Sequence, residues 1–590
     1  MDVTRAGKLT RLRAAMPKHF AALVKLRKAR AKSLSIAAGY EYPHAIAGGD
    51  WIVSEEDPLN LLRQAADAET ISLAANRPRI LASASTVDRQ GFALKYEMAL
   101  NLYSKTMQLE QELQECVRNA FFSLGVAKVY MAESVPVLLE SNEWMDPGRP
   151  YVQSISPHHF NYDSEATAFQ HCSFLCDRYR VAYQDIVSDT RFKSAMRNKI
   201  KQLGMQTNDD ISGQEWGKSL STSEDSIEPL LFLSDVFIPK DGVVLTYIVD
   251  SDFNVVIDEP LSEIEWQGQE TGCYHFLNLG PVPDKTTPSS PAMNLLPMHN
   301  LCNSLYRHLM RQAMNQKDIN VGDKADEEDI KNIRDSIDGD YLGLNNPSVL
   351  QTLRIAGPDQ NVFSFTLNAL EQFSKQAGNL EHKLGLSQSA DTASQEGMIG
   401  NNVGRVEAHN QARFVSFVRG IVGELGRLLF TAKTVSFNMQ REIGGLQIDT
   451  PWRGAVEEGS RMGEYFDYDL DIEPYSMAYK SPQQRLGELD QTFQMILPLA
   501  PILMQQGQMP DVNYWLTERA RLTNNACLEK LVMSVVPPEE QGQAPGGMGP
   551  GGPPKEYIHR SAGSGSGSGQ GGNEQLAMMA AASSDNNNAA

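Results

Sequence analysis

The sequence lacks any long hydrophobic run. No window of its 590 residues approaches the ~18 consecutive apolar residues that a membrane-spanning helix needs. The N-terminus also lacks an apolar stretch followed by small residues, which is the pattern of a secretory signal. We therefore expect a protein that is made in the cytoplasm and has no membrane span.

Cysteine is scarce as well, with six residues, most of them within apolar patterns. Six thiols in a chain of this length do not make a disulfide framework, so a reducing compartment is the simpler interpretation. Three histidines near Cys172 and Cys176 suggest zinc: His158, His159 and His171. Their spacing matches no closed four-ligand pattern, and residues 172 and 176 share one face of a predicted strand. We therefore favour buried packing over a metal site.

Enzyme motifs are missing. The chain has no His-Glu-x-x-His run and no Gly-x-Ser-x-Gly turn. Residues 213–219 resemble a phosphate-binding loop, but three residues separate their glycines where that loop needs four. We expect no enzyme and no cofactor.

The charge is unevenly distributed. A net charge of −20 argues against a surface that grips nucleic acid everywhere, although acidic walls would let DNA slide past. Residues 1–35, in contrast, hold ten Lys or Arg residues against Asp2, with Phe20 and Leu23 among them. This pattern predicts a basic amphipathic helix. Docking to an acidic neighbour, such as another subunit, is favoured over contact with DNA or an anionic membrane.

Two helices with apolar stripes stand at the centre of the sequence, at about 292–316 and 363–384. An acidic insert separates them, with nine acids in residues 318–340. A polar loop with glycines follows at 385–402, and then a third long helix at 403–430. The stripes have the following members: Leu295, Met298, Cys302, Leu305, Leu309 and Ala313 in the first helix, and Phe363, Leu367, Leu370, Phe373, Ala377, Leu380 and Leu384 in the second.

The flanking regions predict a mixture of helix and strand. A long helix at 88–124 ends before Gly125, and a strand follows at 126–131. Further strands are predicted at 152–157, 172–179 and 273–279, and a hairpin at 243–257 with its turn at 250–252. Residues 466–472 alternate between apolar and acidic side chains, which predicts a half-buried strand that completes this β-rich unit. A helix that starts at Ser481 is predicted to be interrupted at Pro498, and two short helices are predicted at 512–522 and 526–535. A Gly-, Pro-, Ser- and Asn-rich tail begins at 537.

The order of helix, acidic insert, helix, polar loop and long helix resembles the portal proteins of tailed double-stranded-DNA phages. The stretch from Val152 to Val187 strengthens the resemblance, because a proline, an aromatic residue, an aspartate and an alanine separate its two strands: Pro157, Phe160, Asp163 and Ala166. The resemblance covers about residues 86–535. It departs from the family at the start of the channel helix, where many portals have threonine–alanine–threonine and this chain has Asp391-Thr392-Ala393-Ser394.

The resemblance implies an α+β fold, mainly α, of a ring subunit. Its parts would be assigned as follows: a basic arm with short helices at 1–85, a wing at 86–290 and 403–480, stem helices at 291–317 and 363–386, a clip at 318–362, a tunnel loop at 387–402, a helical crown at 481–536 and a flexible tail at 537–590. The channel helix belongs to the second part of the wing.

The resemblance also implies a function and partners. The protein would form a homo-oligomeric ring of about twelve copies at one capsid vertex, through which double-stranded DNA is packaged and ejected. The ring would bind the terminase large subunit first and a head–tail adaptor or tail protein later, and it would contact the major capsid protein and possibly a scaffold. It would be assembled in the host cytoplasm and belong to the virion.

The same resemblance implies two groups of site residues. The DNA channel residues would be Ser387, Gln388, Ser389, Thr392, Ser394, Gln395, Asn401, Asn402 and Arg405. The clip residues that dock partners would be Asp326, Glu327, Glu328, Lys331 and Arg334. Two alternatives stay open: an enzyme acting on nucleic acid with an unrecognised site, and another ring protein of the head–tail junction.

Overall fold

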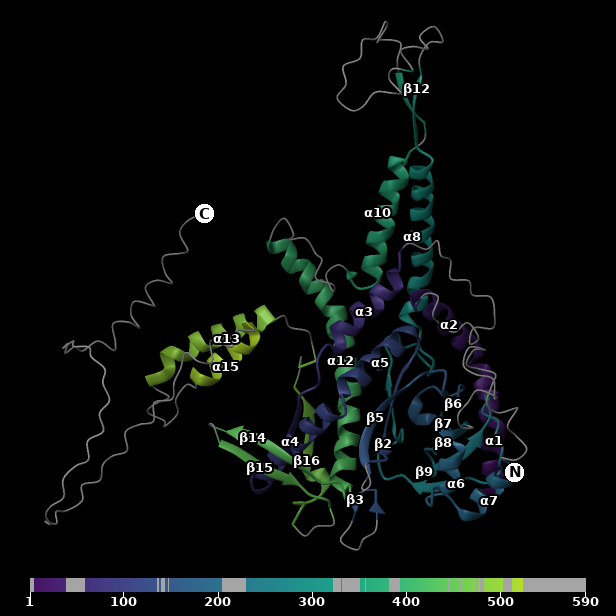
Figure 1. The fold of residues 1–590 in the computed structure, drawn as a ribbon, viewed down its shortest axis with the longest axis vertical. Helices are drawn as coiled ribbons and strands as arrows, with labels where there is room; N and C mark the ends of the chain where they lie inside the picture. Colours follow the sequence, from purple (N-terminus) through teal and green to yellow (C-terminus); the bar gives the residue numbers. More distant parts are fainter. Residues whose placement is uncertain are drawn as a thin grey trace, which may run out of the picture. The chain divides into compact units, whose positions relative to one another are not determined.

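The computed structural model has a mixed α+β fold that is mainly helical. It describes residues 5–38, 59–134, 137–138, 144–146, 148–203, 230–321, 331, 351–355, 357–380, 393–443, 446–455, 459–473, 476–477, 482–501 and 512–523. The chain divides into two compact units, Met1–Ser481 and Pro482–Ala590 (Figure 1). In the part that the structure describes, no helix combines the length and the apolar character that crossing a membrane requires.

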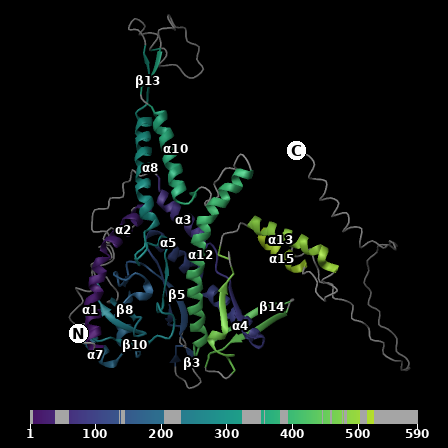
Figure 2. The ribbon, with the colours of Figure 1, turned by 180° about the vertical axis from the view of Figure 1, so that it is seen from behind.

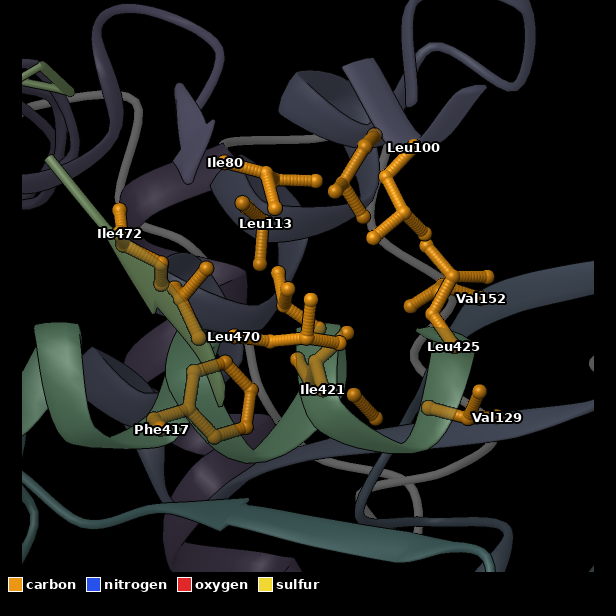
Figure 3. Packing of buried hydrophobic residues seen from close by; sticks show 14 of the residues in the cluster. Ile80, Leu100, Leu113, Val129, Val152, Phe417, Ile421, Leu425, Leu470 and Ile472 are labelled. Atoms are coloured by element: carbon orange, nitrogen blue, oxygen red, sulfur yellow. The ribbon is translucent and has the colours of Figure 1, made fainter. Parts of the chain in front are cut away.

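The main core of the first unit surrounds the helix α12 (Ala393–Thr431). The helices α4 (Gln90–Thr106) and α5 (Leu109–Phe122) pack in this core with the antiparallel pair of β1 (Ile80–Ala84) and β16 (Tyr468–Ile472). Figure 3 shows Phe417, Ile421 and Leu425 of α12 among the apolar side chains of these elements. Segments more than 300 residues apart in sequence therefore share one core.

The predicted helix at 88–124 is two helices. A short 3-10 turn, η3 (Val87–Arg89), precedes α4, and the chain breaks at Gln108, whose φ of 55° is left-handed. The apolar stripe explains the break, since it runs at helical spacing to Met107 and resumes out of phase at Leu109 and Leu113, which are both buried. A straight helix would have placed Glu110 and Gln111 where the stripe should continue.

The pattern predicted that Gly125 marks the end of this helix, but it does not. It is the first residue of strand β2 (Gly125–Ala132), and α5 has already ended at Phe122. A Cβ at Gly125 would lie 2.5 Å from the carbonyl oxygen of Cys116, so glycine allows the strand to pass close against α5.

Two antiparallel sheets make up the β-rich part. A three-stranded sheet has the order β11-β2-β5, with β11 at Tyr274–Leu277 and β5 at Arg149–Ile155. A five-stranded sheet has the order β10-β9-β8-β7-β6. Its strands are β6 (Phe160–Tyr162), β7 (Leu175–Ala182), β8 (Leu230–Ile238), β9 (Val243–Val249) and β10 (Ser262–Glu265). The short helices α6 (Tyr183–Ser188) and α7 (Ser194–Leu203) follow β7.

The predicted hairpin at 243–257 forms only its first strand. The Asp250 carboxylate accepts hydrogen bonds from the backbone N–H groups of Asp252 and Asn254, and Phe253 has a φ of 62°. These bonds close a tight turn, and only an isolated bridge from Val249 to Val255 follows. The partners of β9 are instead β8 and β10, and the sequence pattern missed β10.

A buried ionic cluster joins the two sheets. Lys128 on β2 reaches Asp177 on β7 at 2.9 Å and Asp235 on β8 at 2.7 Å. The hydroxyl of Tyr274 donates to Asp177, and those of Tyr179 and Thr246 donate to Asp235. Burial alone lowers the pKa of Lys128, but the two carboxylates raise it well above its usual value. Burial raises the pKa of Asp177, which Lys128 only partly offsets.

The strand near residue 470 is confirmed, but its predicted place in the β-rich unit is wrong. Tyr468, Leu470 and Ile472 of β16 are buried, and the residues between them point outward. The partner of β16 is β1, so the pair packs on α12 and α4 rather than extending either larger sheet. Phe466, which the alternation also predicted to be buried, lies in a 3-10 turn and is 88% exposed.

The cysteines of the first unit are free thiols: Cys116, Cys172, Cys176, Cys273 and Cys302. All five are buried, and burial raises the pKa of Cys116, Cys172 and Cys273 to about 12. The prediction that Cys172 and Cys176 share one strand face is wrong, because Cys172 precedes β7 and packs in a different cluster from Cys176. Among the described residues, no group of three or more His, Cys, Asp or Glu could hold a metal ion.

The second unit contains a pair of helices. The helix α13 (Pro482–Ile496) and the helix α15 (Val512–Thr523) are packed together through Phe493 and Trp515, whose rings stack at 4.6 Å. Pro498 lies in the 3-10 turn η6 (Leu497–Leu499) that follows α13, where the pattern predicted an interruption. The predicted helix at 526–535 and the predicted tail at 537–590 lie outside the described residues.

We predict that adding one methyl group at Gly426 destabilises the first unit. A Cβ there would overlap Cδ1 of Leu470 and lie 2.7 Å from the hydroxyl of Tyr96. Overpacking of this kind costs about 1–3 kcal/mol, so Gly426→Ala should lower the urea midpoint of unfolding. Gly91→Ala is the matched control, because nothing lies within 4 Å of a Cβ there, and it should unfold no earlier than the unmodified chain. Equal midpoints for both variants would contradict the packing described.

Candidate functional site: the stem and the long helix

Two antiparallel helices form a projection that we call the stem. They are α8 (Pro291–Met314) and α10 (Gln360–Gln376), and they lie side by side in both views (Figures 1 and 2). Ser290 caps α8 with its hydroxyl, and Pro291 occupies the first turn, where a missing N–H costs nothing. Asp359 caps α10, and its backbone N–H donates to the Gln312 side chain of α8 at 3.1 Å. The second helix ends about eight residues earlier than predicted.

The base of the stem is anchored in a second apolar cluster. Leu295, Leu296 and Cys302 of α8 pack there with α3 (Leu61–Ala74) and with Phe121 and Phe122 of α5. Asn303 makes two hydrogen bonds with the backbone of Leu59, at 2.9 and 3.0 Å. This burial fixes the direction in which the stem leaves the first unit.

One face of α8 is covered at its base and bare along its upper half. At the base, Leu295, His299 and Asn303 are buried at intervals of four residues. The same face continues, after a step of three, with the exposed residues Tyr306, Met310 and Met314. Met314 is 81% exposed. An apolar helix face normally needs a covering element, and the described part of this chain places none there.

The second stem helix is bare on two sides. Thr366, Ala369 and Phe373 of α10 are buried. Phe363 and Leu367 flank this buried row and are about half exposed, and Phe365 lies two residues, or about 200°, from Phe363. On α8, Leu301 and Met310 are exposed and Leu295 is buried. Leu295 is covered because α3 and α5 reach the base of the stem.

A β-ribbon extends the stem at its free end. The strands β12 (Lys317–Val321) and β13 (Gln351–Ile355) pair antiparallel from Lys317 opposite Ile355 to Val321 opposite Gln351. The sequence predicted β13 but missed β12. Of the predicted docking residues, Lys331 is helical and exposed, whereas Asp326, Glu327, Glu328 and Arg334 lie outside the described residues.

The long helix α12 is held firmly at its C-terminal end. Its 39 residues span about 58 Å, and its buried side chains from Phe414 to Leu429 belong to the main core. The Arg461 guanidinium donates to the carbonyl oxygens of Phe430 at 2.8 Å and Leu429 at 3.2 Å. It also stacks 4.3 Å from the Trp452 ring, and burial lowers its pKa to about 10. A cation at the last carbonyls of a helix is favoured by the helix dipole.

The glycines of α12 allow close packing against a strand, a helix and a loop. Gly420 lies against the His275 ring of β11, and Gly426 lies against Leu470 and Tyr96. At Gly423 the backbone carbonyl accepts a hydrogen bond from the Tyr465 hydroxyl at 2.7 Å. The helix runs through all three positions without interruption.

The predicted tunnel loop is shorter than expected. α12 already begins at Ala393, so residues 393–402 are helical, and the predicted start at 403 is wrong. Gly397 and Gly400 suggested a loop, but single glycines cost a helix only about 1 kcal/mol each. Ile399, Val403 and Val406 continue the helical spacing, which was the overlooked signal.

The predicted channel residues therefore divide between two segments. Residues placed on the first turns of α12 are Ser394, Gln395, Asn401, Asn402 and Arg405. Residues that lie outside the described part of the chain are Ser387, Gln388, Ser389 and Thr392. The structure brings the first group onto one helix and says nothing of the second.

Sequence reasoning missed Arg461 and the Lys128 cluster. Only the cluster had a signal, since Lys128 and Asp235 are the single charged residues of β2 and β8, and Asp177 lies in β7 with Arg178 and Arg180. Such charges are buried only when they are paired, so three of them in neighbouring strands indicate one cluster. Arg461 lies in a loop, and only the fold brings it to the end of α12.

We predict that replacing apolar residues on the bare stem faces with serine prevents self-association. The double variant Met310→Ser/Leu367→Ser removes apolar area that only another chain could cover, and both positions are at least 40% exposed, so the monomer should still fold. Mass photometry should show a smaller particle than for the unmodified chain, with an unchanged circular dichroism spectrum. Val87→Ser is the matched control, being 80% exposed and away from the stem. If the stem variant assembles like the unmodified chain, its bare faces do not form the contact.

Comparison with known proteins adds no relative. No protein-family model matches this chain, and no curated protein sequence matches it.

Proposed function

We propose that the protein is a portal subunit, which forms a closed ring for the passage of double-stranded DNA. The observation that carries the proposal is the stem, a pair of helices with bare apolar faces on several sides and a β-ribbon at its free end. Faces that differ from one another favour a head-to-tail contact, and a head-to-tail contact that closes on itself makes a ring. An isolated stem would expose these side chains to water.

The arrangement of elements supports distinct roles for different parts of the chain. The β-ribbon lies at the free end of the stem, and most of the acidic insert lies between its two strands in sequence, so this part would serve as the clip that docks the terminase large subunit and later a head–tail adaptor or tail protein. The β-rich part and the buried half of α12 would form the wing within the capsid, in contact with capsid protein. The helices α13 and α15 would belong to the crown.

The DNA path would run past the N-terminal turns of α12. Residues 387–402 are rich in small polar side chains, which offer phosphates weak and exchangeable hydrogen bonds. Their only charged residues are Asp391 and Glu396, and Arg405 is the next cation along the chain. A lining without fixed cations keeps the duplex from sticking, since phosphate neutralisation by Lys and Arg dominates DNA affinity.

Particle mass is the direct test of the ring. One chain has a mass of 65.3 kDa, so about twelve copies would give roughly 800 kDa. Mass photometry of the purified chain should show such a particle, and electron-microscopy class averages should show a central channel. Monomers and dimers alone over a wide concentration range would refute the proposal.

We predict that the acidic insert is required for packaging but not for ring formation. Deleting residues 326–337 removes five of its nine acids and leaves both stem helices and the ribbon strands in place. Rings of this variant should form normally and fail to package DNA in a terminase-dependent assay. Deleting residues 563–569 of the Gly- and Ser-rich tail is a control of similar kind that should package normally. Normal packaging without residues 326–337 would rule out the docking role.

We also predict that fixed cations slow the passage of DNA. Asp391→Lys/Glu396→Lys would place two cations on each subunit at the proposed lining, so DNA should be retained longer and ejected more slowly, most clearly at low salt. Asp391→Asn/Glu396→Gln removes the same acids without adding cations and serves as the control. Ejection rates that match the unmodified particle across a range of salt would show that this segment does not line the path.

A further inference from the structure

The N-terminal arm, residues 5–38, is docked as a separate piece. Its helices are α1 (Arg5–Ala22) and α2 (Val24–Ala38). Leu12, Met16 and Phe20 of α1 fill an apolar groove on the five-stranded sheet. The ring of Phe20 lies 4.9 Å from that of Phe253.

Polar contacts make the docking specific. Asn161 of β6 donates to the backbone carbonyl of Met16 at 2.8 Å, within the buried contact. At the rim, Lys8 pairs with Asp241 at 3.0 Å and Lys18 with Glu165 at 3.6 Å. Two further ion pairs join Arg5 to Glu263 and Arg13 to Asp258. The predicted docking to an acidic neighbour is therefore present, with the arm's own chain as the neighbour.

The chain that follows the arm is far longer than this docking needs. Asn60, which caps α3, donates to the carbonyl of Ala37 at 2.8 Å, so the end of the arm and the start of α3 are adjacent. Residues 39–58 join these two points, and a chain of that length can span about 70 Å. Connections between neighbouring helices usually need only ~2–8 residues. The excess length would allow the arm to reach the same groove on another copy.

The distribution of charge along the chain favours docking of the arm on another copy. The first 35 residues carry a net charge of +9, from ten Lys or Arg residues against Asp2, so the remaining 555 residues carry −29. Bodies with so much charge of one sign repel one another when they are packed into a ring. An arm that crosses to the neighbouring body places a positive segment between two negative ones, whereas a self-docked arm leaves the contact between bodies unchanged.

We infer that, in the assembled protein, the arm of each subunit docks in the groove of the neighbouring subunit. The inference rests on the proposed ring. The contacts of α1 are the same in both arrangements, because the groove belongs to an identical chain, so exchange loses none of the docking contacts. In the ring it adds the whole arm contact to each junction between subunits.

The ion pair of Lys8 with Asp241 gives a direct test. A water-soluble carbodiimide joins a lysine and a carboxylate in contact through an amide bond, with loss of water. We would co-express two full-length variants, Lys8→Gln and Asp241→Asn, and cross-link the purified assembly. Neither variant can form the 8–241 link within itself, so the link arises only when the arm of the Asp241→Asn chain lies on the Lys8→Gln chain. With random mixing, about a quarter of the docking sites would be competent.

Three controls accompany this experiment. The unmodified chain should form the 8–241 link in either arrangement, and each variant alone should not form it. The 18–165 link, which both variants retain, reports that the arms are docked in every sample. Peptide mass spectrometry of the co-assembly should show the 8–241 link at about one quarter of the unmodified yield.

The outcomes separate the exchange from the ring itself. Rings by mass photometry without the 8–241 link, and with the 18–165 link present, would show self-docked arms and overturn the inference while leaving the proposed function standing. The link in small particles without rings would support exchange and refute the ring. Particles that are only monomeric and lack the link would overturn both.

Discussion

The seating of α12 on the first unit is the constraint on which the rest of the structure depends. The helix contributes its apolar face to the main core, and that core also contains β1 and β16 from opposite ends of the sequence. Close approach is possible because glycine stands where α12 meets Leu470 and Tyr96. Arg461 then holds the last carbonyls of the helix against Trp452. With one end fixed in this way, the direction of the N-terminal turns follows from the helix being continuous.

Burial also explains how the stem can project without a core of its own. The face of α8 that carries Leu295 and His299 is covered by α3 and α5 at its base, and the helix simply continues beyond that cover. A pair of helices this thin can bury only the residues between them, such as Phe373 of α10. The described part of the chain leaves apolar residues such as Met310 and Leu367 bare on the other sides, so a covering neighbour would stabilise the stem and link its folding to assembly.

The sequence predicted most helices and strands because their signal is local. Spacing alone located α8, α10 and the strand β16. Partners could not be found in this way, since the pairing of β1 with β16 spans nearly 400 residues. The break at Gln108 and the helical start of α12 were missed for a related reason. Both depend on how an apolar stripe fits its neighbours, and glycine or glutamine at one position does not reveal that fit.

The candidate site was predictable only in part, and the reason is electrostatic. The charges of residues 326–334 predict a docking surface from composition alone, and composition does not identify the partner. A buried charge, in contrast, indicates which groups must surround it. Lys128 is tolerated within β2 because Asp177 and Asp235 approach it from two other strands, so its presence in the sequence already implies its surroundings. The basic arm combines both cases: its apolar side dictates a groove, which the five-stranded sheet supplies, while its charge identifies the partner only as acidic. Since every copy of the chain offers the same acidic groove, one set of contacts can serve both the folding of a single chain and, by exchange, the joining of two.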